Sequence, residues 1–454
     1  MPEEKFFPAK RKPSSKGCRS ANFASGPSFV PGTVGRRYLS LLFLPICRRR
    51  MVKRPVVSAS FSYATLEETL EVAPRRKDMF VGIPKETAFL ENRVPLTPEA
   101  VSVLVNNGVE VVIEQGAGDG SFYFDSDYSE AGARIAYDKE DVFKATTIIK
   151  SAPICEEELP LLQPSQVIIS PIHLPLIQQE MIEEMVRKKI IAIAFEFIKD
   201  DAGTYPVVRS MSEIAGSSAI LTAAQLLSNG SHQGKGILLG GITGVPPAEV
   251  VIIGAGVVGT YAARTALGLG ASVKVFDNSI YRLMRLQNHV GHRLYTSVIE
   301  PVTLARDLAN AHVVIGAMKP KNGVTPMVVT EEMVQNMKAG SVIIDVSIDR
   351  GGCVETSRMT THEKPVFRKY DVIHYCVPNI ASGVSRTASR SISNVLMPIL
   401  LEFNERGGAE NVILYKTGLR HGVYLYKGSV TSASISKRFG MKYTDLDLLM
   451  ASGI

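Results

Sequence analysis

The sequence predicts an α/β fold of two domains, each a parallel sheet with helices on both faces. The chain has 454 residues, of which 45% are hydrophobic, and this is more than one compact core usually holds. From residue 79 onward, short apolar runs alternate with helical segments, a pattern typical of parallel sheets. A second series of the same kind begins near residue 250 with a glycine-rich turn.

The first series opens with the strand FVGIP at residues 80–84. A helix should follow, because Thr97 supplies an N-cap hydroxyl, Pro98 suits the first helical position and Glu99 is an early carboxylate. Gly108 should end this helix. Further strands are expected at 109–114, 146–150, 166–170 and 190–195, with a helix over 175–189. These elements predict one α/β domain.

The second series follows a helical stretch from about 213 to 228 and a hairpin-like passage at 234–249. Its strands are expected near 250–253, 273–276, 313–316, 341–346 and 372–377. After residue 386 helical patterning resumes, and the chain should return to the first domain. We therefore predict a substrate domain at 79–205 plus 387–454, and a dinucleotide-binding domain at 206–386.

The first 78 residues differ from the rest in charge. Residues 1–56 contain 13 Lys or Arg against two Glu, a balance of +11, whereas the whole chain carries +7; the difference leaves −4 for residues 57–454. We expect a disordered basic extension here. It is interpreted either as an upstream in-frame extension, since Met51 and Met79 offer later starts, or as an organellar or secretory targeting segment.

Composition argues against several classes of protein. The folded body is mildly acidic, which gives no reason to expect nucleic-acid binding. The longest apolar run of the extension, Tyr38 to Cys47, is about half the ~20 residues of a membrane-spanning helix. Five cysteines without a CxxC pair fit a reducing compartment, predict neither a disulfide nor a metal site, and favour the cytoplasm.

The strongest motif is the glycine turn GAGVVG at residues 254–259. It follows an apolar strand, opens a helix and precedes a strand that ends in Asp277, as in Rossmann-like, doubly wound domains. Backbone N–H groups at such a turn bind pyrophosphate, and the carboxylate suits the adenosine ribose. Asp277 would repel a 2′-phosphate, so NAD is the expected cofactor, although Arg282 could weaken that preference. The contacts predicted at the turn are Gly254, Gly256, Val258 and Gly259.

Several polar residues follow other predicted strands, where ligands bind in open α/β sheets. Arg93 could hold a substrate carboxylate in a bidentate fork, although a loop arginine alone is more often a solvated charge. Lys150 and His173 end two strands of the first domain, and His173 is either a proton carrier or a structural residue. Asp349 could face the nicotinamide and a substrate amine, and Asn379 could contact the nicotinamide or its ribose.

These segments resemble a known family. The motifs occur in the order seen in alanine dehydrogenases and in the related NAD-binding subunit of proton-translocating transhydrogenase. The resemblance covers roughly residues 79–400 and rests on six segments: GIPKE-x6-RVPLTPEAV (82–101), SPIHL (170–174), MSEIAG (211–216), GKGILLGGITGVPPAEVVIIGAGVVG (234–259), VIIDVSIDRGGC (342–353) and HYCVPN (374–379).

The resemblance implies reversible oxidative deamination of L-alanine to pyruvate and ammonia, in a homohexamer with the active site between the two domains. It implies that Arg93 binds the substrate carboxylate, that His173 is the acid/base and that Asp349 handles the amine. It also implies contacts to NAD from the three glycines, Asp277, Arg282, Asn379 and Ser212. For Ser212, helix capping is the alternative.

Two positions depart from the family pattern. The second substrate-binding lysine of alanine dehydrogenases is replaced by Ala152, and Lys150, which matches the first, could reach the same pocket because residues i and i+2 of a strand share a face. Arg350 stands where the family commonly has glutamine, and its charge should lower the pKa of Asp349. A transhydrogenase-like NAD(H)-binding subunit and a non-catalytic NAD-binding module therefore stay open as alternatives.

Overall fold

The protein is described here from a computed structural model. The description covers residues 79–88, 91–174, 177–230, 234–291, 293–319 and 325–451. The expectations for residues 1–78 lie outside the described residues. None of the helices in these ranges is long and apolar enough to cross a membrane.

The first sheet has eight strands in the order β15-β14-β6-β5-β4-β1-β2-β3. Strands β1 to β6 pair in parallel, whereas β14 is antiparallel to β6 and β15 to β14. The strands are β1 (Phe80–Ile83), β2 (Glu110–Glu114), β3 (Arg134–Ala136), β4 (Thr147–Ile149), β5 (Val167–Ile169), β6 (Ile191–Ile193), β14 (Val423–Tyr426) and β15 (Ser429–Val430).

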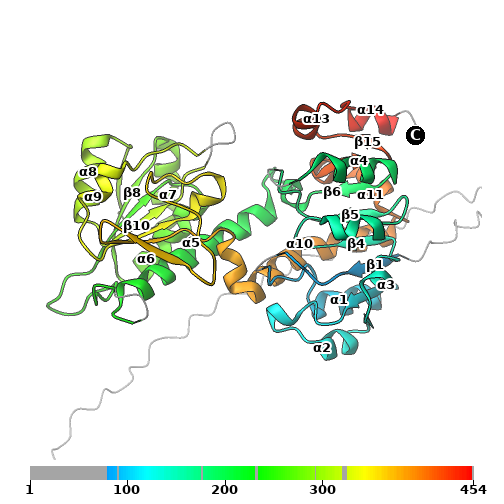
Figure 1. Ribbon diagram of the computed structural model, residues 1–454, viewed down its shortest axis with the longest axis horizontal. Helices are drawn as coiled ribbons and strands as arrows, with labels where there is room; N and C mark the ends of the chain where they lie inside the picture. The colour runs from blue at the N-terminus through cyan, green and yellow to red at the C-terminus, as the bar shows by residue number, and fades with distance from the viewer. Residues whose placement is uncertain are drawn as a thin grey trace, which may run out of the picture. The chain divides into compact units, whose positions relative to one another are not determined.

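Helices from both ends of the described chain accompany this sheet (Figure 1). Side chains of α10 such as Ile392 and Leu396 join the same core as Val81 and Ile169. The helices are α1 (Pro98–Asn106), α2 (Asp125–Glu130), α3 (Lys139–Val142), α4 (Gln179–Arg187), α10 (Ser385–Glu405), α11 (Ala409–Tyr415), α12 (Thr417–Arg420), α13 (Ala433–Phe439) and α14 (Leu446–Ala451), with the 3-10 turns η1 (Asp119–Ser121), η2 (Glu156–Leu161) and η3 (Phe195–Phe197).

The second sheet has seven strands in the order β12-β13-β11-β10-β7-β8-β9, all parallel except β12. They are β7 (Glu249–Ile253), β8 (Ser272–Phe276), β9 (Tyr295–Ser297), β10 (Val313–Gly316), β11 (Val342–Asp345), β12 (Val366–Lys369) and β13 (Val372–Tyr375). Its helices are α5 (Pro206–Leu227), α6 (Val257–Gly268), α7 (Ile280–Val290), α8 (Pro301–Asn310) and α9 (Glu331–Gln335), with the turns η4 (Val346–Arg350) and η5 (Ile380–Val384).

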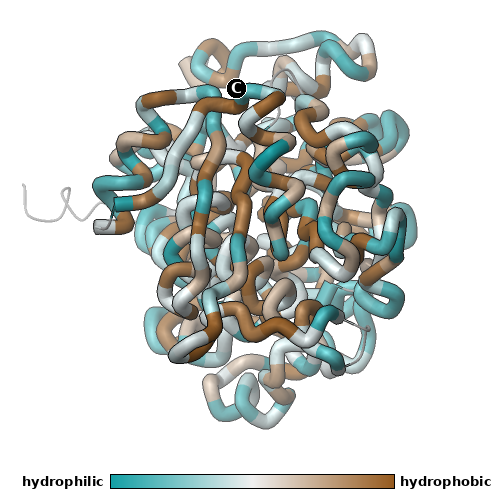
Figure 2. Tube along the Cα trace, turned by 90° about the vertical axis from the view of Figure 1, so that its left-hand side faces the viewer, coloured by the Kyte–Doolittle hydropathy of each residue, from teal (hydrophilic) through white to brown (hydrophobic). Residues whose placement is uncertain are grey.

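Each sheet is buried on both faces. Neighbouring residues of one strand enter different cores, as Ile168 and Ile169 do in β5 and Val250 and Val251 do in β7. The alternation follows from the two-residue period of a strand. In Figure 2 hydrophobic segments run through the interior, and hydrophilic segments are frequent along the outside. The predicted two-domain α/β fold is confirmed.

Several local predictions were wrong. The sheets are mixed rather than wholly parallel, because antiparallel strands cap one edge of each. Helix α5 begins at Pro206 rather than near 213. Thr97 is the N-cap of α1, but its hydroxyl makes no bond to the helix backbone and is hydrogen-bonded to the Glu99 carboxylate instead. The strands that sequence reasoning missed are short edge or near-edge strands: β3, β9, β12, β14 and β15.

Candidate active site

The glycine turn joins β7 to α6. Gly254 has φ +113°, and a Cβ built there would lie 2.3 Å from the Ala317 carbonyl oxygen. A Cβ at Gly259 would lie 1.8 Å from the Gly254 carbonyl oxygen. Both positions therefore require glycine. A Cβ at Gly256 would meet nothing within 4 Å, so one side of the turn is open, as a backbone cradle for pyrophosphate needs.

Asp277 supports this turn directly. The residue is 4% exposed, and its carboxylate accepts hydrogen bonds from the backbone N–H groups of Ala255 and Ser279, each at 2.7 Å. Because each carboxylate oxygen has two lone pairs, capacity remains for ribose hydroxyls. The Arg282 guanidinium lies 3.7 Å from the Asp277 carboxylate. Val258 lies in the first turn of α6 and is half-buried.

His173 lies in the loop between β5 and α4 with φ +41°. Its imidazole interacts electrostatically with four charged side chains from distant parts of the sequence. The pKa of His173 is lowered, chiefly by desolvation; Asp349 and Glu91 oppose this shift, whereas Arg93 and Arg350 add to it. The side chain is open to solvent, but enough protein surrounds it to disfavour the charged form. Three residues predicted from separate motifs thus come together here.

Asp349 lies in η4, directly after β11. Its carboxylate accepts a hydrogen bond from the backbone N–H of Asn379 at 3.2 Å. Desolvation raises the pKa of Asp349, although Asn379, His173, Arg350 and Arg93 all act to lower it. The expectation that Arg350 lowers this pKa was correct for its own contribution and wrong for the net shift, because desolvation outweighs the nearby cations.

Arg93 is bound by a carboxylate that sequence reasoning missed. Its Nε donates to Glu91 Oε1 at 2.7 Å and its Nη2 pairs with Glu91 Oε2. Among the described residues, the acceptor that its Nη1 contacts is the Met211 sulfur at 3.5 Å. Sulfur is a weak acceptor, so one edge of the guanidinium keeps capacity for a substrate carboxylate. The spacing Glu-x-Arg in one loop was the available signal.

Asn379 connects residues of the two predicted domains. Its side-chain amide donates to Glu91 Oε2 at 3.1 Å, while its backbone N–H bonds to Asp349. It has φ +52°, a left-handed conformation that asparagine tolerates better than most residues. Asn379 therefore holds the Arg93 partner and the Asp349 carboxylate at once.

Ser212 and Lys150 are placed differently from the group around His173. Ser212 lies inside α5 and its hydroxyl donates to the Val208 carbonyl at 2.7 Å, so the helix-capping alternative was wrong. Lys150 is 1% exposed, and its ammonium lies 2.9 Å from Glu86 and 2.7 Å from Glu158. Two carboxylates therefore neutralise the lysine that was expected to reach the substrate.

Ala152 is buried at 4% exposure, and its backbone N–H donates to Glu86 Oε1 at 3.1 Å. This position thus brings no ammonium, and the neighbouring Lys150 does not replace it in the structure. Within the described ranges, no group of three or more His, Cys, Asp or Glu is arranged to hold a metal ion.

Comparison with known proteins identifies the family. Residues 82–215 match the model of the alanine dehydrogenase/PNT N-terminal domain, and residues 219–433 match that of its C-terminal domain. Alanine dehydrogenase of Bacillus subtilis is 40% identical over 366 residues, which are 80% of this chain and 96% of the relative.

Two solved structures are also similar. An L-alanine dehydrogenase has a TM-score of 0.75 at 33% identity, covering 80% of this chain and 99% of that one. A transhydrogenase from Sinorhizobium meliloti has a TM-score of 0.66 at 26% identity, covering 78% and 99%. These matches agree with the glycine turn, with NAD as the cofactor and with the motif order, and we conclude that the chain belongs to the alanine dehydrogenase/PNT family.

Proposed function

We propose that this protein is an NAD-dependent alanine dehydrogenase. The reaction is L-alanine + NAD⁺ + H₂O → pyruvate + NH₄⁺ + NADH + H⁺, and it is reversible. The observation that carries the proposal is the meeting of Arg93, His173 and Asp349 at the carboxyl ends of strands from both sheets. This set offers a cation for a carboxylate and two groups for protons, as an α-amino acid requires.

Each residue has a role that follows from its surroundings. Arg93 binds the substrate carboxylate through the guanidinium edge that Glu91 leaves open. His173 is neutral near pH 7 because desolvation lowers its pKa, so it can accept a proton from the substrate ammonium, release it to solvent and then accept a proton from the attacking water. Asp349 holds the ammonium or attacking ammonia. NAD, when bound, accepts the hydride from the substrate Cα.

The cofactor site consists of the glycine turn with Asp277, Arg282, Asn379 and Ser212. Gly254, Gly256 and Gly259 give the pyrophosphate access to backbone N–H groups. Asp277 accepts hydrogen bonds from the ribose hydroxyls with the lone pairs that Ala255 and Ser279 leave unused. Lys150 does not contact the substrate in this proposal. It organises the site through its ion pairs with Glu86 and Glu158.

The test is production of NADH by the purified full-length protein from L-alanine and NAD. Other L-amino acids serve as competitors, and pyruvate with ammonium tests the reverse direction. Turnover of alanine above all other amino acids supports the proposal. If the protein binds NAD and turns over no amino acid, the proposal is wrong.

The alternative function is a transhydrogenase-like NAD(H)-binding subunit. Ala152 and the neutralised Lys150 favour it, because the substrate loses an ammonium partner. Hydride exchange between NADH and an oxidised NAD analogue, in the absence of any amino acid, would support this alternative. Tight NAD binding without either reaction would support a non-catalytic module.

The assembly and the location of the protein are further proposals. We propose a homohexamer, which light scattering coupled to size-exclusion chromatography would test. We propose a cytoplasmic location on the basis of the described cysteines Cys155, Cys353 and Cys376, which are all free thiols. Cell fractionation, together with mass determination of the mature N-terminus, would separate this from organellar targeting. We propose domain boundaries at 79–205 plus 387–454 and at 206–386.

A further inference from the structure

The loop that carries His173 has a conformation that needs support. His173 has φ +41°, a left-handed value that is unfavourable for a residue with a Cβ and persists only where the surroundings impose it. The loop follows β5 and runs through Ile172 to Leu174, so its backbone decides where the imidazole lies relative to Asp349.

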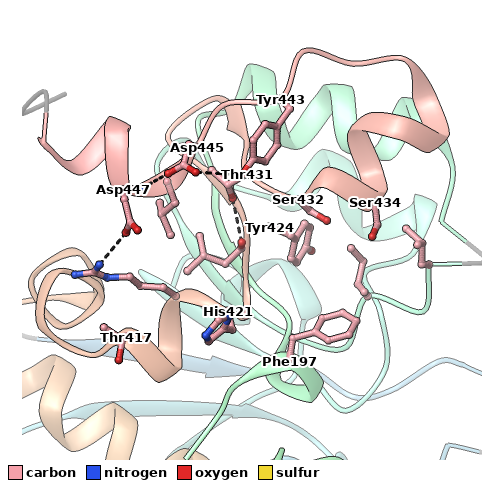
Figure 3. Close-up of a pocket in the computed structure, with 16 residues that line it drawn as sticks. Phe197, Thr417, His421, Tyr424, Thr431, Ser432, Ser434, Tyr443, Asp445 and Asp447 are labelled. Atoms are coloured by element: carbon pink, nitrogen blue, oxygen red, sulfur yellow. Dashed lines mark hydrogen bonds and ion pairs between the residues drawn. The ribbon is translucent and has the colours of Figure 1, made fainter. Parts of the chain in front are cut away.

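Side-chain packing supports this loop on one side, because Ile172 is 4% exposed within the hydrophobic core and Leu174 packs against the same core. Ile172 and Leu174 line a cavity of about 360 Å³ together with Phe197 of η3 and Tyr424 of β14. Figure 3 shows this cavity, with the Phe197 ring and the Tyr424 side chain among its labelled walls. The cavity leaves the other side of these two side chains without a packing partner, so a polar contact to the loop backbone adds to the support that the core provides.

A polar contact of this kind comes from a carboxylate on the neighbouring strand end. Glu196 lies in η3, just after β6, which pairs in parallel with β5. Its Oε1 accepts the backbone N–H of Ile172 at 2.8 Å, and the backbone N–H of His173 lies near enough to help lower the pKa of this carboxyl group. The Tyr424 side chain is also hydrogen-bonded to the Ser170 side chain, at the start of the same loop.

The burial of the Glu196 carboxylate costs free energy, which a residue chosen only for packing would avoid. Desolvation raises the pKa of its carboxyl group, and in the part of the chain that the structure describes its buried Oε2 has no hydrogen-bond partner. Buried polar atoms without partners are rare in proteins and call for a reason. The hydrogen bond from Ile172 N–H, which fixes the loop of a proton-transferring residue, supplies such a reason.

We propose that Glu196 is a positioning residue for the reaction: it holds the loop of His173 in its left-handed conformation and so places the imidazole beside Asp349. The inference rests on the proposed role of His173. Glu196 acts through the backbone of Ile172 and His173, and it does not touch the substrate.

The variants separate the hydrogen bonds from the charge. Glu196→Ala removes the acceptor, whereas Glu196→Gln keeps an acceptor oxygen and removes the charge. The matched control is Asp307→Asn, because Asp307 of α8 is also a buried carboxylate with one partnerless oxygen, bonded to Lys274 at 3.3 Å in the other sheet's domain. If the Ala variant does not fold, Glu196→Leu fills the same space without an acceptor.

Kinetics are the first measurement. We expect Glu196→Ala or Glu196→Leu to lower kcat with alanine by about 100-fold, since a shift of ~1 Å in a reacting group has effects of this size. The KM for NAD should stay unchanged. Glu196→Gln should retain kcat within about threefold, and Asp307→Asn should retain it fully. Equal losses in the Ala and Gln variants would overturn the proposal.

An NMR titration gives a readout that does not depend on turnover. The His173 ring signal, assigned by its loss in His173→Asn, should titrate below pH 6.5 in the wild type because desolvation lowers its pKa. In Glu196→Ala the released ring should titrate closer to 6.5, and in Glu196→Gln it should not move. An unchanged His173 titration in the Ala variant would refute the role of Glu196. Wild-type inactivity with alanine would refute only the proposed function.

Discussion

The turn after β7 and the loop after β5 both require a residue with positive φ, and they support this conformation in different ways. Both follow a parallel strand and both contain a left-handed residue: Gly254 at φ +113° and His173 at φ +41°. At Gly254 the backbone itself is the binding group, so glycine provides the conformation without strain. At His173 the functional group is a side chain, so glycine cannot be used and the surroundings must hold a residue with a Cβ at positive φ. The glycine turn is a local motif that can be recognised in the sequence. The conformation of the His173 loop depends on a contact with Glu196, which is distant in the sequence.

The largest effect that would test this comparison is expected at Gly259. Gly259→Ala places a Cβ 1.8 Å from the Gly254 carbonyl oxygen, so the turn must open. We expect NAD affinity to fall by at least 100-fold and the free energy of unfolding to fall by about 2 to 4 kcal/mol. NAD titration and chemical denaturation measure the two quantities.

The control for this variant lies in the same helix. A Cβ at Gly268 meets nothing within 4 Å, so Gly268→Ala should leave NAD binding intact and should stabilise the protein by up to about 1 kcal/mol. Wild-type NAD affinity in Gly259→Ala would show that NAD binding does not depend on the backbone conformation of this turn.

The next prediction concerns the His173 side chain. His173→Asn should lower kcat with alanine by about 100- to 10,000-fold, because a positioned acid/base contributes a factor of that order. The NAD affinity and the stability of this variant should not fall, since asparagine, with its short polar side chain, adopts positive φ readily.

Asp349→Asn should give a similar loss of turnover and the same NAD affinity. Steady-state NADH formation and equilibrium NAD binding distinguish these outcomes. A His173→Asn protein with unaltered turnover would show that the loop carries no catalytic group.

The pH dependence of activity follows from the sign of the His173 shift. His173 must be neutral to accept a proton, and its pKa lies below the usual 6.5. Alanine-dependent kcat/KM should therefore be constant near neutral pH and should fall about tenfold per pH unit below an inflection under 6.5. A pH profile of kcat/KM in a constant-ionic-strength buffer tests this. An inflection above 7 would contradict the desolvated histidine.

The last prediction concerns His374, a structural histidine in the other domain. His374 of β13 is fully buried, contacts the Thr356 hydroxyl at 2.8 Å and has its pKa lowered to about 4, chiefly by desolvation. In the unfolded state the His374 imidazole has its ordinary pKa of about 6.5. Stability should therefore fall by up to about 3 kcal/mol as the pH drops from 6.5 to 4.

In His374→Gln this part of the pH dependence of the unfolding free energy should be absent. Urea denaturation at several pH values measures the slope. If the slope is unchanged in His374→Gln, another group controls acid stability. The two histidines thus separate acid loss of activity, which follows His173, from acid loss of stability, which follows His374.

The sequence was sufficient for the parts of the molecule that are local in the chain. Central strands such as β7 and β10 are continuous apolar runs because both of their faces are buried, and the glycine turn sits directly after one of them. Edge strands such as β12 and β15 are short and depend on their neighbours, so their propensity alone did not predict them.

The site could be predicted only in part. Arg93, His173 and Asp349 each follow a predicted strand, and the family motifs marked them. Glu91 and Glu196 were missed because a carboxylate near a loop has no distinctive pattern, and only the fold brings Glu196 to the backbone of Ile172. The net pKa shift of Asp349 was also beyond the sequence, since it is set by desolvation.

The antiparallel pairing of β14 with β6 has a consequence for the order of synthesis. The sheet of β7 to β13 is encoded without interruption between residues 249 and 375, so it can close as soon as that stretch has left the ribosome. The other sheet keeps the edge of β6 unpaired until residues 423–426 emerge. An unpaired strand edge invites association with other chains. A nascent chain that stops short of β14 therefore contains one finished domain and one exposed edge, and this interval is when the protein most needs a chaperone.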